Sequence, residues 1–75
     1  MKAVLDESDR TILKMLLEKN MSVEEIQADM RINSIKCTRS LGWLEENILA
    51  KFKDGKWRAT SEGKNFYNKF NNNTY

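Results

Sequence analysis

The chain has 75 residues, with 13 basic and 11 acidic side chains and a net charge of +2 at pH 7. This length allows one small domain with a modest hydrophobic core. A single cysteine and the lack of histidine exclude an intrachain disulfide and any site that depends on histidine. No apolar run reaches membrane-spanning length and no signal-peptide pattern is present, so we expect a cytoplasmic protein with no membrane association.

Positive charge is concentrated in the second part of the chain. Residues 1–30 carry four basic and seven acidic side chains, a net charge of −3, whereas residues 31–75 carry nine basic and four acidic side chains, a net charge of +5. Segregated charge favours one basic face on the folded protein, and such a face favours an anionic partner. We expect residues 1–75 to form one domain, with residues 1–5 as an N-terminal arm and residues 71–75 as a frayed tail.

The first part of the chain predicts two amphipathic helices. The first is expected over residues 7–19, where apolar residues recur at helical spacing behind a group of acids. The second is expected to begin after Ser22, which forms a capping box with Glu25, and to end near Met30. A short turn then leads to the next helix.

A third helix is expected over residues 34–46, with Asn33 as its N-cap. Its core face repeats at i, i+4 and i+7 and consists of Cys37, Leu41 and Leu44. Glycine inside a helix costs about 0.5–1 kcal/mol relative to alanine. We therefore expect another backbone segment to pass close to Gly42.

The opposite face of this third helix is polar and basic. It carries Ser34, Ile35, Thr38 and Arg39, with Lys36 on its flank. Acidic side chains return only at Glu45 and Glu46, at the far end of the helix. This half-face is therefore a candidate surface for an anionic partner.

A β-hairpin is predicted around Asp54-Gly55, because a two-residue type I′ turn needs positive φ at both of its central positions. The loop length sets a register that pairs Ala50 with Ala59, Lys51 with Arg58, Phe52 with Trp57 and Lys53 with Lys56. Side chains alternate between the two faces of a strand, so one face carries Lys51, Lys53, Lys56 and Arg58. Like charges placed directly opposite destabilise a hairpin, which favours an anionic partner for this face. The alternative is a solvated edge whose lysines prevent aggregation.

A fourth helix is expected to begin after Thr60 as its N-cap and to end near Asn71. Its apolar stripe consists of Phe66, Tyr67 and Phe70. This is more aromatic surface than a short terminal helix needs, so we expect a homodimer through the N-terminal segment and this helix. The predicted core of the whole protein consists of Ile12, Leu16, Ile26, Cys37, Leu41, Leu44, Trp57 and Phe66.

The order of these elements resembles the winged-helix (winged helix-turn-helix) family of DNA-binding domains. The residues that carry the resemblance are Ser22-Val23-Glu24-Glu25-Ile26, Ile32, Leu41-x-x-Leu44-Glu45-Glu46 and Ala59-Thr60-Ser61-Glu62-Gly63. The last of these is similar to the Leu-Thr-x-x-Gly stretch that follows the wing in MarR-like and related small prokaryotic or viral regulators. The resemblance covers about residues 6–70 and implies an α/β, mainly α fold of three helices, a two-stranded wing and a C-terminal helix.

The resemblance also implies a function, because in this family the third helix is the recognition helix and the hairpin is the wing. It implies sequence-specific binding of double-stranded DNA by a small transcriptional regulator. The recognition residues would be Asn33, Ser34, Ile35, Lys36, Thr38 and Arg39, and the wing residues that contact phosphates or the minor groove would be Lys51, Lys53, Lys56 and Arg58. The family usually has glycine with positive φ after its third helix. This sequence has Ile48 there, so we expect Asn47 to take the positive φ.

The same sequence allows two other functions besides DNA binding. A protein-interaction winged helix, acting as an adaptor in a transcription complex, would use an exposed apolar patch, which Ile35, Tyr67, Phe70 and Tyr75 offer. Binding that survives high salt would favour this alternative. An enzyme is disfavoured, because the chain has no histidine, no Gly-rich phosphate loop and no pair of acids beside a base. We therefore expect no enzymatic activity, no cofactor and no metal.

Overall fold

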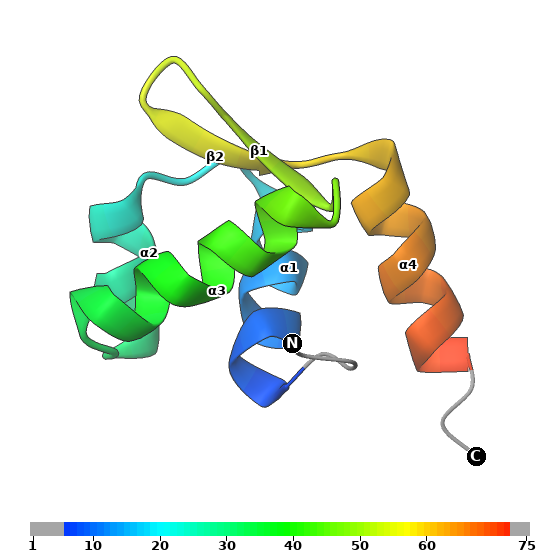
Figure 1. Cartoon of the computed structure of the whole chain (residues 1–75), viewed down its shortest axis with the longest axis horizontal. Coiled ribbons are helices and arrows are strands. Elements are labelled where there is room, and N and C mark those ends of the chain that lie inside the picture. The colour runs from blue at the N-terminus through cyan, green and yellow to red at the C-terminus, as the bar shows by residue number, and fades with distance from the viewer. Residues whose placement is uncertain (1–5, 73–75) are drawn as a thin grey trace.

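The structure is a computed structural model that describes residues 6–72, with side chains described as far as Lys69. Its elements are α1 (Glu7–Glu18), α2 (Val23–Met30), α3 (Ser34–Glu46), β1 (Ala50–Lys53), β2 (Lys56–Ala59) and α4 (Ser61–Asn72). The first three helices pack together, the hairpin lies across them on one side, and α4 stands at one end (Figure 1). The predicted α/β, mainly α architecture of three helices, a hairpin and a C-terminal helix is confirmed.

Some predicted segments lie outside the part of the chain that the structure describes. They are the N-terminal arm (residues 1–5) and the end of the predicted tail (residues 73–75), while Asn71 and Asn72 belong to α4. Within residues 6–72, no helix is long and apolar enough to cross a membrane.

Reciprocal side-chain caps fix the starts of α1 and α2. The Asp6 carboxylate accepts the Asp9 N–H at 3.0 Å, and the Asp9 carboxylate accepts the Asp6 N–H at 3.4 Å. The Ser22 hydroxyl accepts the Glu25 N–H at 3.2 Å, and the Glu25 carboxylate accepts the Ser22 N–H at 2.8 Å. Each box satisfies two backbone donors that have no partner inside the helix. The capping box predicted for α2 is confirmed, and the capping box of α1 is one that was not predicted from the sequence.

Single side chains cap α3 and α4, as the sequence predicts. The Asn33 carboxamide oxygen accepts the Lys36 N–H at 2.8 Å, and the Thr60 hydroxyl oxygen accepts the Gly63 N–H at 2.9 Å. The Thr60 hydroxyl also donates to the Ile48 carbonyl at 2.6 Å. Thr60 therefore joins the start of α4 to the turn between α3 and β1.

The end of α3 differs from the prediction. The Leu49 N–H donates to the Leu44 carbonyl at 2.8 Å and the Ile48 N–H donates to the Glu45 carbonyl at 3.0 Å, which is the bond pair of a Schellman motif. This motif needs a left-handed backbone at the first of its two donor residues, which is Ile48, and Ile48 has φ +61°. Asn47 has φ −96°, so its predicted positive φ is wrong. Leu44 and Leu49 are both buried, and their packing decides which residue takes the left-handed conformation.

The hairpin has the predicted turn and register. Asp54 has φ +54° and Gly55 has φ +82°, and the four predicted cross-strand pairs are all present. On the apolar face, the rings of Phe52 and Trp57 lie 5.4 Å apart between centroids. The segment between α1 and α2 also pairs with β2, because Met21 and Trp57 exchange backbone hydrogen bonds of 3.0 and 2.6 Å. This third paired segment was not predicted from the sequence.

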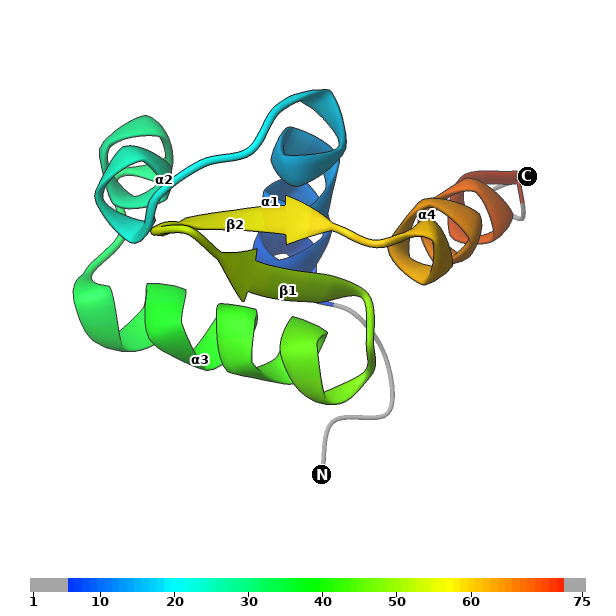
Figure 2. The same ribbon diagram turned by 90° about the horizontal axis from the view of Figure 1, so that it is seen from above.

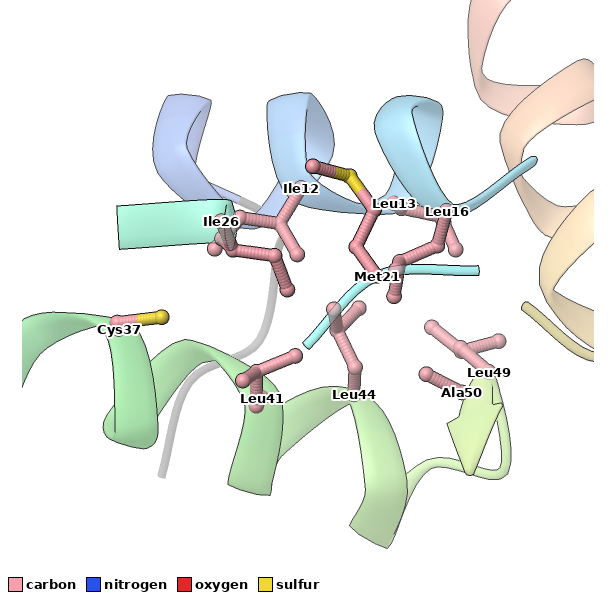
Figure 3. Close-up of a cluster of buried hydrophobic side chains, with 10 residues drawn as sticks. All are labelled: Ile12, Leu13, Leu16, Met21, Ile26, Cys37, Leu41, Leu44, Leu49 and Ala50. Atoms are coloured by element: carbon pink, nitrogen blue, oxygen red, sulfur yellow. The ribbon is translucent and has the colours of Figure 1, made fainter. Parts of the chain in front are cut away.

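The core lies between α1, α2, α3 and the start of β1 (Figure 3). Six of the eight predicted core residues are buried, and Trp57 is half-buried against them. The prediction for Phe66 is wrong, because 36% of its side chain is exposed. The buried Gly63 and the half-buried Tyr67, four residues apart, turn toward the body instead and leave Phe66 at the edge. The full buried set is Ile12, Leu13, Leu16, Met21, Ile26, Cys37, Leu41, Leu44, Leu49 and Ala50.

The close backbone approach lies at a different glycine from the one predicted. A Cβ on Gly42 would meet no heavy atom of the described residues within 4 Å, so the expectation for Gly42 is wrong. A Cβ on Gly63 would collide with the Leu49 carbonyl oxygen. The start of α4 therefore rests directly on the backbone before β1, which only glycine allows.

Candidate nucleic-acid interface

The predicted recognition face of α3 is exposed along its whole length. Asn33, Ser34, Ile35, Lys36, Thr38 and Arg39 are all exposed, whereas Cys37 and Ser40 turn inward. Ile35 is 70% exposed, which makes it a prominent apolar group among polar neighbours. The carboxamide oxygen of Asn33 is engaged as the cap of α3, so this residue offers mainly its N–H donors to a partner.

The first turn of α3 favours negative partners. α1 and α2 each carry two acids in the first turn, whereas α3 carries none. The free N–H groups and the macrodipole at a helix start are therefore not neutralised by a side chain of the same turn. Lys36 adds a positive charge at this place.

A shallow depression of about 340 Å³ runs beside this face, which we call the α3 depression. It is lined by Asp6, Asn33, Ile35, Lys36, Arg39 and Ser40. Asp6, the cap of α1, therefore lies beside the two predicted cations of α3. The sequence gives no sign of this neighbour, because Asp6 lies in a distant part of the chain from Lys36 and Arg39.

The four cations of the wing are also exposed, and they share the face that the register predicts. Lys56 is partly engaged, because its Nζ lies 3.8 Å from the Glu25 carboxylate of α2. The hydrogen bond from the Ser22 backbone lowers the pKa of Glu25 below its ordinary value of 4.5, and the positive charge of Lys56 acts in the same direction. Glu25 is therefore ionised at neutral pH and links the wing to α2.

A second depression, of about 180 Å³, lies on the wing. This wing depression is lined by Asn20, Lys53, Asp54, Lys56 and Arg58. Three of the four predicted wing cations are thus brought together, while Lys51 lies outside the lining. Asn20, from the segment between α1 and α2, was missed by sequence reasoning, since the pairing of Met21 with β2 has no local signal.

The two predicted surfaces lie at the same end of the molecule. Both views show the turn of the hairpin, α2 and the start of α3 at the end opposite α4 (Figures 1 and 2). The start of α3 and the Asp54-Gly55 turn of the wing therefore share one end of the fold.

The remaining chemistry of the described residues is limited. Cys37 is buried, and burial raises the pKa of its thiol, which disfavours the reactive thiolate. No group of three or more metal-ligating side chains comes together within residues 6–72.

The chain has the winged-helix fold. Its elements are three packed helices, a two-stranded wing and a helix that follows the wing. Among solved structures, the chain is similar to ZitR of Lactococcus lactis, with a TM-score of 0.81 and 22% identity over 96% of this chain and 54% of that one. It is also similar to HlyU of Vibrio cholerae, with a TM-score of 0.68 and 21% identity over 89% of this chain and 78% of that one. A third similar structure is IdeR of T. acidophilum, with a TM-score of 0.70 and 20% identity over 92% of this chain and 34% of that one.

These likenesses establish the fold, and the chain spans about half the length of the ZitR chain. No protein-family model matches the chain, and no curated protein matches it in sequence.

Proposed function

We propose that the protein binds double-stranded DNA sequence-specifically as a small, non-enzymatic transcriptional regulator of the cytoplasm. The observation that carries this proposal is the placement of two exposed basic surfaces, on α3 and on the wing, at one end of a winged-helix fold. The three similar structures belong to winged-helix transcription regulators, which supports the same role.

The α3 face supplies groups suited to base edges in the major groove. Arg39 is the candidate for a bidentate contact with guanine, and Lys36 is the second candidate. Ser34 and Thr38 offer short hydroxyls for bases or phosphates, and Ile35 offers an apolar surface. Asn33, at the helix start, adds N–H donors at the edge of this set.

The wing supplies charge without base specificity. Lys51, Lys53, Lys56 and Arg58 lie on one face of the hairpin, so they can meet one run of phosphates or the edge of the minor groove. Neutralising phosphates releases counterions, which gives binding a steep salt dependence. The wing would therefore set affinity and register, and α3 would set sequence preference.

We also propose that the protein works as a homodimer. One such domain offers one recognition helix, and two-fold dimers are the usual way to contact two half-sites. The N-terminal segment and the aromatic residues Phe66, Tyr67 and Phe70 of α4 are the candidate contact. The 36% exposure of Phe66 supports it, because this ring is left at the edge of the protein's own core.

A protein-interaction role is the second candidate. It is supported by exposed apolar side chains on three parts of the fold, namely Ile35 (70%), Ile48 (65%) and Phe52 (52%). These residues belong to α3, to the turn that follows it and to β1, and they do not follow one another along a single element. Single exposed apolar residues of this kind are ordinary on protein surfaces. DNA binding is therefore the better supported function.

The test is a gel shift with random-sequence duplex at 50 and 200 mM salt, on the order of the range over which phosphate contacts lose most affinity, beside a mass measurement in solution. DNA binding predicts complexes at low salt that weaken steeply at high salt. A protein partner in place of DNA predicts no shift of duplex at either concentration. A monomeric mass at high micromolar concentration without DNA would count against the dimer.

A further inference from the structure

The segment between α1 and α2 is held against the wing by backbone hydrogen bonds. The Met21 N–H donates to the Trp57 carbonyl at 3.0 Å, and the Trp57 N–H donates to the Met21 carbonyl at 2.6 Å. β2 therefore has a partner on both sides, with β1 on one edge and Met21 on the other. Figure 2 shows β2 between β1 and this segment. The two-stranded wing thus has a third backbone segment paired beside it, in a fixed register.

This register places Asn20 on the cationic face of the wing. Side chains of neighbouring residues in an extended pair point to opposite faces. Met21 and Trp57, which pair directly, both turn toward the core, and Asn20 precedes Met21. The side chain of Asn20 then falls beside Arg58, the residue that follows Trp57. Both residues are exposed and line the wing depression.

The chemistry of the wing depression suits a phosphate group. Its lining holds the cations Lys53, Lys56 and Arg58, one acid, Asp54, and the carboxamide of Asn20. Ammonium and guanidinium groups are strong donors to phosphate oxygens, and a carboxamide adds two neutral N–H donors. Donors therefore come from both edges of β2.

Glu25 contacts one of the cations that line the depression. Its carboxylate is fixed by the Ser22 N–H at 2.8 Å and lies 3.8 Å from the Lys56 Nζ. The side chain of Lys56 is 53% exposed, so it retains access to a second anion. An exposed ion pair of this kind contributes little free energy, so Lys56 can exchange the Glu25 carboxylate for a phosphate.

We propose that Asn20, Lys53, Lys56 and Arg58 form a seat for one phosphate group, with Asn20 as a binding residue outside the wing itself. This inference rests on the proposed function, in which the phosphate belongs to the backbone of duplex DNA. A free polyphosphate carries the same chemistry, and the two arms of the experiment distinguish the two sources.

The first arm measures the affinity of random-sequence duplex for three variants that each change the charge by one unit. Asn20→Asp adds a negative charge to the seat, and Asp54→Asn removes one while keeping a residue that type I′ turns favour. Asn68→Asp is the matched control, because Asn68 is exposed on α4, at the opposite end of the molecule. At low salt, Asn20→Asp should weaken binding about five- to tenfold for all sequences alike, and Asp54→Asn should strengthen it by a few-fold.

In this first arm, an effect of Asn20→Asp equal to that of Asn68→Asp would overturn the seat, because the affinity would then follow only the net charge. The opposite signs expected for Asn20→Asp and Asp54→Asn cannot arise from misfolding alone. Thermal melting of each variant confirms that the fold is kept.

The second arm needs no DNA. It titrates the protein with inorganic tripolyphosphate and monitors the amide resonances of the protein by NMR. In the parent, the side-chain amide of Asn20 and the backbone amides of Lys53 and Arg58 should shift together and saturate in the millimolar range, on the order expected for a few exposed charge contacts. In Asn20→Asp, the backbone amides should shift several-fold less at equal concentration.

The two arms separate failure of the seat from failure of the proposed function. Shifts with tripolyphosphate but no binding of duplex would keep the seat and reject DNA as the partner. Binding of duplex with equal effects of the Asn20→Asp and Asn68→Asp variants would keep DNA binding and reject the seat.

Discussion

Replacing Ile48 by glycine should leave the stability of the protein nearly unchanged, because the relief of a left-handed backbone offsets the loss of an apolar side chain and the extra freedom of glycine in the unfolded chain. Ile48 has φ +61°, in the left-handed region that costs an L-residue roughly 1–2 kcal/mol. Its side chain is 65% exposed, so the burial lost on replacement is about 0.5–1 kcal/mol of the 1.5–3 kcal/mol for a fully buried isoleucine. The hydrogen bonds at the end of α3 use backbone groups and remain.

The matched control is Ile35→Gly, which makes the same substitution at 70% exposure in the helical backbone of α3. Both variants lose similar burial and both gain the extra freedom of glycine in the unfolded chain, so these two costs cancel in the comparison. The remaining difference is the left-handed strain that only Ile48→Gly relieves. Ile48→Gly should therefore be the more stable variant by about 1–2 kcal/mol.

Thermal unfolding followed by circular dichroism measures this difference, and urea unfolding checks it. For a domain of this size, 1 kcal/mol shifts the melting temperature by about 4–8 °C, so the two variants should melt on the order of 10 °C apart. Melting temperatures that agree within about 2 °C would show that Ile48 carries no backbone strain. A lower stability of Ile48→Gly than of Ile35→Gly would refute the Schellman assignment itself.

Further variants test the glycines, the wing and α3. Gly63→Ala should lose about 1–3 kcal/mol in urea unfolding, because its Cβ collides with a backbone carbonyl, whereas Gly42→Ala should gain about 0.5–1 kcal/mol. Equal effects would contradict the packing of α4. Replacing Lys53 and Lys56 together by alanine should weaken all duplexes alike and flatten the log–log salt slope by up to about 0.9 units, the value for one phosphate, because both lysines contact the same phosphate. Full affinity at low salt in this double variant would make the basic face a solvated edge. Arg39→Ala should cost about 1–3 kcal/mol on a selected site and much less on random duplex, and equal losses on both would remove its role in base recognition.

Local chemistry let the sequence predict the secondary structure closely. The bounds of α2 and α3 and the four pairs of the hairpin agree with the prediction. Each depends on groups a few residues apart, such as the Ser22–Glu25 box and the Asp54-Gly55 turn. Such interactions form between neighbours in the chain whatever the rest of the molecule does, so their residue types carry a direct signal.

The candidate site was predicted residue by residue, but its surroundings were not. All ten predicted site residues are exposed, and three of the four wing cations share one depression. Their role as DNA contacts stays a prediction. Asp6 beside Arg39, and Asn20 beside Arg58, became visible only in the structure, because each neighbour is separated by more than thirty residues in the sequence.

Other features were decided by tertiary packing against the local preference. Asn47 is the better left-handed residue by type, yet Ile48 takes that conformation because Leu44 and Leu49 are both held in the core. The sequence by itself thus determined helices, caps, hairpin register and the face on which each charge lies, since these follow from spacing and short-range bonds. Only the tertiary structure decided which backbone is strained, where α4 rests and which distant side chains meet, because those outcomes minimise the free energy of the whole core rather than of one segment.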